Sequence, residues 1–429
     1  MDVGKFPGML ALLVSAATMA KDPRPDVAGF KAYELPDYTI VTHDEGNARP
    51  VPRLAAQIHG VLAKLLDRAE RAPTSPTYIL LVPESVWIRY LRPGQGIDGE
   101  FVPAKFANYI LLNNARDASR IGKSVFHEYT HWFLHTQYPG VEPLWFDEGL
   151  AEFVTTAEFR GARVKLGDPD NWSSNGWIPL EKLFRLDRNS AEYRNLSTSG
   201  VVHRESWAIV HRGLAGDAEF GRQMFAFLDA LNAQQPIDAA VLSSFGVTAR
   251  ELDQTIHAYL NPGYRFAAVD RYRELRITVD PVPARKLPAG RTMGQLESLQ
   301  LIADIMLASG FNAGRLPEVV DAVRSIAPDS SAEISLRMRI AARDGDDATL
   351  DRLVAAVEPS ASDATMLRGA GLALFERAEQ TNREELSNQA LELLDRAIAA
   401  RPGDAEAVWA HSMLAAKLKR WPDRPVGGR

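Results

Sequence analysis

The sequence predicts an α+β region followed by an all-α region, and three observations support this fold class. In the first two thirds of the chain, short apolar and β-branched runs alternate with segments whose apolar residues recur at a helical period. The segment 277–295 contains three prolines and little periodicity, which is typical of a linker. Beyond this linker, every periodic segment has a helical period.

The composition is that of a globular protein whose expected partner is a peptide or another protein. A chain of 429 residues exceeds the usual size of one hydrophobic core, so two or three domains are expected. With 46% hydrophobic and 24% charged residues, a disordered or fibrous chain is excluded. The net charge of −6 is mild and no dense Lys/Arg run occurs, which argues against nucleic acid or an anionic membrane as the main partner.

The chain contains no cysteine. This absence excludes disulfides, thiolate metal ligands and a cysteine nucleophile. Any metal site in this sequence must therefore use histidine, aspartate or glutamate.

The N-terminal segment 1–20 is predicted to be an export signal. Lys5 precedes an apolar run over 9–14, and small residues follow at Ala16, Ala17 and Ala20. The run is shorter than the ~20 residues of a spanning helix, so no stable membrane anchor is expected. An export signal implies a periplasmic or secreted protein. The alternatives, a buried N-terminal helix or a misassigned start, imply a cytoplasmic one.

The α+β region, 21–276, is predicted from alternating strand and helix patterns. Short apolar runs bounded by turn residues predict strands at Tyr38–His43, Thr77–Pro83 and Asn108–Asn114. A helical period predicts helices at Pro52–Ala72, Asp117–His135, Trp145–Phe159, Glu205–Leu214 and Glu219–Leu231.

The all-α region, 296–420, is predicted to consist of paired helices, with a short tail at 421–429. Three helices each end in a proline followed by small or polar residues, at Pro328, Pro359 and Pro402. These prolines are 31 and 43 residues apart, and the region resembles tetratricopeptide repeats, whose period is ~34 residues. An irregular helical bundle is the alternative. In either case the region is expected to pack against the first region or to present a groove to a protein partner.

The main functional motif is HEYTH at residues 127–131. Helical residues four apart lie on one face, so His127 and His131 can direct two imidazole nitrogens at one metal ion. Glu128 lies about 100° further round the helix, beside the ion, where it could take a proton from a metal-activated water. The motif alone is also compatible with an ordinary amphipathic helix, because HExxH sequences arise by chance.

The third metal ligand is indicated by the sequence downstream of HEYTH. A catalytic zinc ion usually has three protein ligands and one open position. Metzincin proteases place a glycine and a histidine at positions that hold Leu134 and Gln137 here. The stretch PLWFDEGLAEF, 143–153, resembles instead the WxxEGxAE element of gluzincin metallopeptidases, in particular the peptidase-MA-like group. This resemblance implies a zincin-like α+β domain, one Zn²⁺ per chain and Glu148 as the third ligand.

Two acidic neighbours of Glu148 receive different predictions. Glu152 follows Glu148 by four residues and lies on the same helical face, where it could accept a hydrogen bond from the distal nitrogen of a ligand histidine. A solvated surface charge is the alternative for Glu152. Asp147 points elsewhere on the helix and is expected to cap or bridge locally.

A candidate for stabilising the oxyanion follows from a second resemblance. The run VVHRESWAIVHRGL, 201–214, resembles a helix of peptidase-MA-like proteins that carries a tyrosine where this chain has His203. The resemblance implies that His203 stabilises the oxyanion, with His211 and Tyr193 as further candidates. The strand Asn108–Asn114 occupies the place of the zincin edge strand that pairs with extended substrate.

These residues together predict a zinc-dependent peptidase. His127, His131 and Glu148 would bind Zn²⁺, Glu128 would act as general base and His203 would stabilise the oxyanion. Because the histidines must be neutral to bind the ion, metal affinity is expected to fall below the imidazole range near pH ~6.5.

Two other functions stay open. The first is a binding or scaffold protein that works through its helical repeats, with a structural or inactive zincin-like domain. The second is a non-peptidase HExxH hydrolase, although the peptide deformylase type needs a cysteine ligand that this chain lacks.

Overall fold

The computed structural model describes residues 27–67, 75–91, 97–138, 140, 142–168, 176–260, 274–280, 285–357 and 362–419, without the side chains of 118, 119 and 196. The predicted export signal, 1–20, and the predicted tail, 421–429, lie outside these residues. Within the described residues, no helix combines the length and apolar character needed to cross a bilayer.

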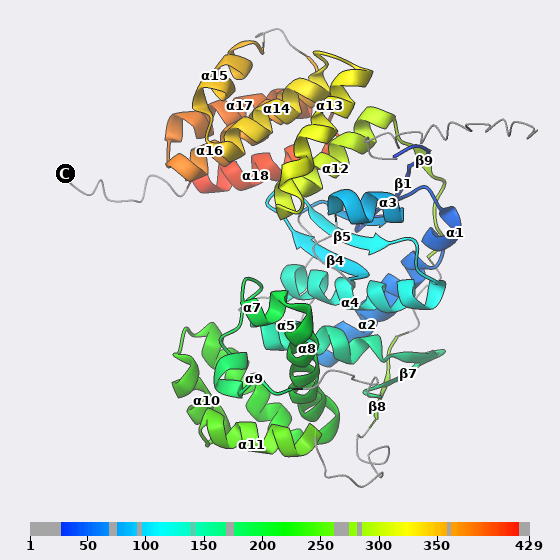
Figure 1. Ribbon diagram of the computed structural model, residues 1–429, viewed down its shortest axis with the longest axis vertical. Helices are drawn as coiled ribbons and strands as arrows, with labels where there is room; N and C mark the ends of the chain where they lie inside the picture. Colours follow the sequence, from blue (N-terminus) through cyan, green and yellow to red (C-terminus); the bar gives the residue numbers. More distant parts are fainter. Residues whose placement is uncertain are drawn as a thin grey trace, which may run out of the picture.

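A six-stranded mixed sheet lies in the middle of the molecule (Figure 1). In spatial order its strands are β4 (Gly99–Pro103), β5 (Asn108–Asn113), β3 (Thr77–Val82), β2 (Thr39–Thr42), β1 (Lys31–Glu34) and β9 (Arg291–Thr292). Strands β2, β3 and β5 are parallel, whereas β4, β1 and β9 pair antiparallel with their neighbours. The three predicted strands are confirmed as β2, β3 and β5, while β1, β4 and β9 were not predicted.

The edge strand next to β5 is β4, and β5 itself lies between β4 and β3. The prediction that Asn108–Asn114 is the edge strand was therefore wrong. The sequence of β5 is apolar at successive positions because both faces of the strand are buried. Ile110 and Leu112 belong to the core on one face, and Tyr109 and Leu111 belong to the core on the other. The shorter β4 ends in a proline, which is typical of an edge strand.

Helices cover both faces of this sheet (Figure 1). One face packs against α2 (Val51–Leu66) and α4 (Ala118–Gln137), and the other against η1 (Trp87–Leu91), α12 (Gln295–Ser309) and α13 (Leu316–Ile326). Alternate side chains of β3 enter the two cores, Ile79 and Leu81 on the α4 face and Leu80 and Val82 on the α12 face. Burying each such side chain contributes roughly 1.5–3 kcal/mol, so the sheet holds the two helical layers together.

The helix that carries HEYTH is confirmed as α4, and the next predicted helix is confirmed as α5 (Leu144–Thr155). The chain turns at Thr156, so Phe159 lies in β6 (Glu158–Arg160) and not in the helix. A three-stranded antiparallel sheet consists of β6, β7 (Arg163–Leu166) and β8 (Leu275–Thr278). The helices that complete this part are α6 (Leu180–Leu183), α7 (Ala191–Arg194), α8 (Leu196–His211), α9 (Ala218–Asn232), α10 (Ile237–Phe245) and α11 (Ala249–Leu260).

After β9, the described chain is helical throughout, as predicted. The helices that follow α13 are α14 (Ser331–Asp344), α15 (Asp347–Ala355), α16 (Ala364–Thr381), α17 (Glu384–Ala400) and α18 (Ala405–Lys419). Pro328 and Pro402 follow the ends of α13 and α17, whereas Pro359 lies outside the described residues. The core formed by α12 and α13 is continuous with the sheet, so the all-α region packs against the first region.

Candidate metal centre

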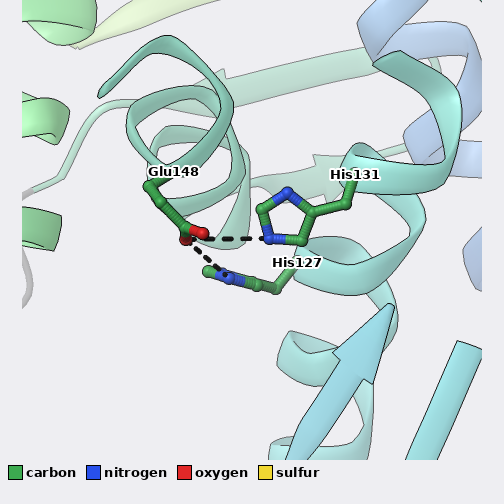
Figure 2. Close-up of side chains that lie close together, drawn as sticks. All are labelled: His127, His131 and Glu148. Carbon is green, nitrogen blue, oxygen red and sulfur yellow. Dashed lines mark ion pairs between the residues drawn. The ribbon is translucent and has the colours of Figure 1, made fainter. Parts of the chain in front are cut away.

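The three residues predicted to bind metal lie together between α4 and α5 (Figure 2). Nε2 of His127 is 3.5 Å, and Nε2 of His131 is 3.7 Å, from Oε2 of Glu148. Ligand atoms around a tetrahedral zinc ion lie about 3.3–3.6 Å from one another, as follows from metal–ligand distances of about 2.0–2.2 Å. The cluster could therefore hold one metal ion.

The surroundings of the Glu148 carboxylate indicate whether these residues fit a metal ion. Its side chain is fully buried, and Oε1 accepts a hydrogen bond from the Tyr193 hydroxyl at 2.7 Å. In the part of the chain that the structure describes, Oε2 accepts no hydrogen bond. A buried carboxylate oxygen that accepts no hydrogen bond is costly. A cation between Oε2 and the two Nε2 atoms would remove that cost, so the donor set fits a divalent ion.

The charges in the cluster would couple metal binding to proton release. Burial by itself lowers the pKa of His127, but the neighbouring carboxylates, Glu148 first, outweigh it and raise the pKa to about 10. Burial raises the pKa of Glu148, but His131 and His203 lower it well below its usual range. Among the protein groups alone, a charged His127 thus faces an ionised Glu148. A metal ion would have to displace the proton on His127. Protons would therefore compete with the metal at pH values above the ~6.5 expected from the sequence.

Asp147 orients His131 through the second ring nitrogen. Asp147 Oδ1 lies 2.5 Å from Nδ1 of His131, and Oδ2 accepts a hydrogen bond of 2.5 Å from Nη2 of Arg188. The prediction that Asp147 caps or bridges locally was wrong, because the packing of α5 on α4 turns this side chain toward His131. A carboxylate on Nδ1 holds the tautomer whose Nε2 lone pair is free for a metal.

Replacing Asp147 by Asn is expected to weaken zinc binding by about 10- to 100-fold, the usual cost of losing such an outer partner. The amide cannot balance the charge that Arg188 brings to this buried position, and it is a weaker acceptor for Nδ1 of His131. The measurement is the zinc dissociation constant from competition with a chromophoric chelator. Asp238→Asn, which removes an exposed carboxylate on α10, is the matched control. An unchanged affinity in Asp147→Asn would show that this contact does not support the metal.

Glu152 contacts His203 more closely than it contacts a predicted metal ligand. Its Oε1 is 2.8 Å from Nδ1 of His203 but 3.8 Å from Nδ1 of His127, which is too long for a hydrogen bond. These three residues form a second group that could hold a metal, but the hydrogen bond already accounts for Glu152 and His203. Glu152 thus orients His203, and this leaves Nε2 of His203 3.7 Å from Oε2 of Glu148.

The position of His203 depends on a glycine in α5. A Cβ on Gly149 would lie 2.4 Å from the carbonyl oxygen of Ser206, so any side chain there would push α8 away. The close approach lets the His203 ring stack on that of His127, with 6.0 Å between centroids. Burial lowers the pKa of His203, but Glu148 and Glu152 outweigh it and raise the pKa. The raised pKa favours the protonated form of His203, in which Nε2 is a hydrogen-bond donor beside the cluster.

Two residues that the sequence did not single out for this role contact the Glu148 carboxylate. Tyr193, considered only for the oxyanion, binds Glu148 instead. Arg188 lies in the loop before α7, and its Nη1 is 3.9 Å from Oε1 of Glu148. No local motif marks Arg188, which reaches the cluster only through the fold.

Glu128 lies against the start of the edge strand β4. A Cβ on Gly99 would lie 2.8 Å from Cγ and Oε1 of Glu128, so the glycine leaves the space that this side chain fills. Burial raises the pKa of Glu128 and the two histidines lower it, with a net increase. Burial, with help from Glu128, also raises the pKa of Glu100 in β4 to about 8. A raised pKa improves a carboxylate as a proton acceptor near neutral pH.

His211, a further candidate for the oxyanion, lies in the core and contacts other groups. Its Nδ1 is 2.6 Å from the Tyr259 hydroxyl, and its ring packs against Trp207 and Phe153. Burial lowers the pKa of His211 to about 4, so this ring is neutral. These contacts are those of a structural core histidine.

No protein-family model matches the chain, and no curated protein matches it either. The functional argument therefore depends on the residues of the cluster and on their geometry.

Proposed function

We propose that the chain is a zinc-dependent peptidase of the gluzincin type, with a zincin-like catalytic region and tetratricopeptide-like C-terminal helices. The observation that carries this proposal is the buried Oε2 of Glu148, which faces the Nε2 atoms of both HExxH histidines. The WxxEGxAE stretch supports it independently. His127, His131 and Glu148 would be the ligands.

The protein side chains around the cluster have complementary roles in hydrolysis. When bound, zinc would supply a Lewis acid that polarises the scissile carbonyl and lowers the pKa of water toward ~7. Glu128 accepts a proton from the attacking water and returns it to the leaving amine. His203, oriented by Glu152, donates a hydrogen bond from Nε2 to the oxyanion.

The edge strand β4 is the proposed binding surface for an extended substrate. Among the described residues, β4 pairs with one strand only, β5, so its other edge can pair main chain to main chain with a peptide. Gly99 in β4 touches Glu128. A peptide on this edge therefore brings its carbonyl groups next to the general base. The predicted export signal would place this activity in the periplasm or outside the cell.

Chelation tests the proposed function. Purified protein is expected to hold one zinc ion per chain and to cleave members of a degenerate peptide pool. A chelator should abolish cleavage, and added Zn²⁺ should restore it, whereas mock-treated protein keeps its activity. Full zinc occupancy with no cleavage of any pool would contradict the proposal. It would favour a binding protein that works through its helical region and has a structural zinc site.

A further inference from the structure

The turn between β4 and β5, residues 104–107, inserts into the C-terminal helices. The Phe106 side chain is buried, and its ring centroid is 5.5 Å from that of Phe375 in α16. The core cluster that contains Phe106 otherwise consists of residues between 338 and 414. Phe106 thus belongs to the core of the helical region, although its strand belongs to the sheet.

The neighbouring Lys105 binds the same helices in three ways. Its Nζ lies 2.5 Å from Oε2 of Glu379 and 3.9 Å from the centroid of the Phe375 ring, both in α16. Its carbonyl oxygen accepts a hydrogen bond of 3.0 Å from Nε1 of Trp409 in α18. We call this set of residues, Phe375, Glu379 and Trp409, the α16–α18 socket. Ion pair, ring contact and backbone hydrogen bond together define one position for the turn.

The socket lies at one end of β4 and the metal cluster at the other. The five residues of β4 span about 16 Å. At its first residue, Gly99, the strand touches Glu128, and its third residue, Phe101, packs on His135 of α4 with 5.7 Å between centroids. An edge strand is hydrogen-bonded to another strand on one side only. Contacts at its two ends therefore help to fix its position. The socket contacts the turn at the end of β4 away from Gly99.

We propose that the α16–α18 socket positions β4 against Glu128, so that Lys105 and Phe106 are positioning residues for hydrolysis. Neither residue touches the metal ligands or the general base. The inference rests on the proposed peptidase function and gives the helical region a role within the chain. It predicts that loosening the turn displaces β4, the proposed substrate edge, without removing a metal ligand.

Lys105→Met and Phe106→Ala test this proposal. Lys105→Met keeps the aliphatic stem but loses the charge, and Lys105→Arg keeps the cation. Arg377→Met, which breaks an ion pair of α16 with Asp347 away from the turn, is the matched control. Hydrogen–deuterium exchange of amides 97–113 is expected to be at least several-fold faster in Lys105→Met and Phe106→Ala. Lys105→Arg and Arg377→Met should exchange like wild type. Circular dichroism identifies a variant that fails to fold. If Phe106→Ala does not fold, Lys105→Met alone tests the proposal.

Turnover is measured on a peptide selected from the degenerate pool. In Lys105→Met, kcat is expected to fall about tenfold while zinc stays at one per chain, because a displacement of about 1 Å can cost up to ~100-fold. Lys105→Arg should restore kcat to within about twofold. Unchanged exchange, or faster exchange with an unchanged kcat, would overturn the inference. Wild-type protein that cleaves no peptide would overturn the peptidase proposal, whereas the exchange rates decide separately whether the socket holds β4.

Discussion

Replacing Glu128 by Gln is expected to reduce kcat for peptide hydrolysis by about 10²- to 10⁴-fold, the usual contribution of a general base. Glutamine has nearly the same shape as glutamate, so it fills the space beside Gly99, but it cannot accept the proton of the attacking water. Zinc should remain at one ion per chain, because Glu128 is not one of the three clustered ligands. The measurements are kcat on a cleaved peptide and zinc content by atomic spectroscopy.

The control for this variant is Glu142→Gln. Glu142 precedes α5, lies 3.9 Å from the non-ligand His135, and has a pKa that burial raises to about 7. Glu142 shares the raised pKa of Glu128, but its side chain is only partly buried and does not lie beside the cluster, so kcat should stay near the wild-type value. Wild-type turnover in Glu128→Gln would show that hydrolysis uses another base.

Replacing Glu148 by Ala is expected to abolish the stabilisation that zinc confers on the folded chain. In wild type, zinc at 100 times its dissociation constant should stabilise the fold by about 2.7 kcal/mol, because the ion binds the assembled cluster and not the unfolded chain. Without Glu148 only the two imidazoles remain, and the loss of affinity should exceed the roughly 10- to 100-fold cost of losing an outer partner. The measurement is the zinc-induced shift in Tm by calorimetry.

Glu152→Ala is the control for Glu148→Ala, since it removes a carboxylate one helical turn away on the same helix. This variant should keep a zinc-induced shift in Tm, because Glu152 contacts His203 and is not one of the proposed ligands. A shift that survives in Glu148→Ala and disappears in Glu152→Ala would move the metal to the group formed by His127, Glu152 and His203.

The site residues that lie closest to one another in the sequence were the easiest to place from the sequence alone. His127 and His131 lie one helical turn apart, so forming α4 is enough to bring their rings together. Strands β3 and β5 were predictable because both of their faces are buried, which requires apolar residues at successive positions. Glu148 was reached through its resemblance to a known motif, and its distance to the histidines depends on how α5 packs on α4.

The outer contacts of the cluster were not predictable in this way. Spacing along α5 favoured Glu152 as the partner of a ligand histidine, yet Asp147 contacts His131. Which face of α5 meets α4 depends on the packing angle between the helices, and Gly149 sets how closely α8 can approach. Arg188 contacts the cluster from a loop that no local pattern connects to it.

The sequence by itself determined the HExxH helix, the apolar inner strands, the helical character of the C-terminal region and a set of candidate metal ligands limited to histidine and carboxylate. These features follow from local periodicity, from burial of successive residues and from the absence of cysteine. Only the tertiary structure decided that β4 is the edge strand, that Asp147 and Tyr193 contact His131 and Glu148, and that the β4–β5 turn sits in the α16–α18 socket. Each of these depends on contacts between residues far apart in the chain, where the angle and distance between packed elements, and not the order of residues, decide which side chains meet.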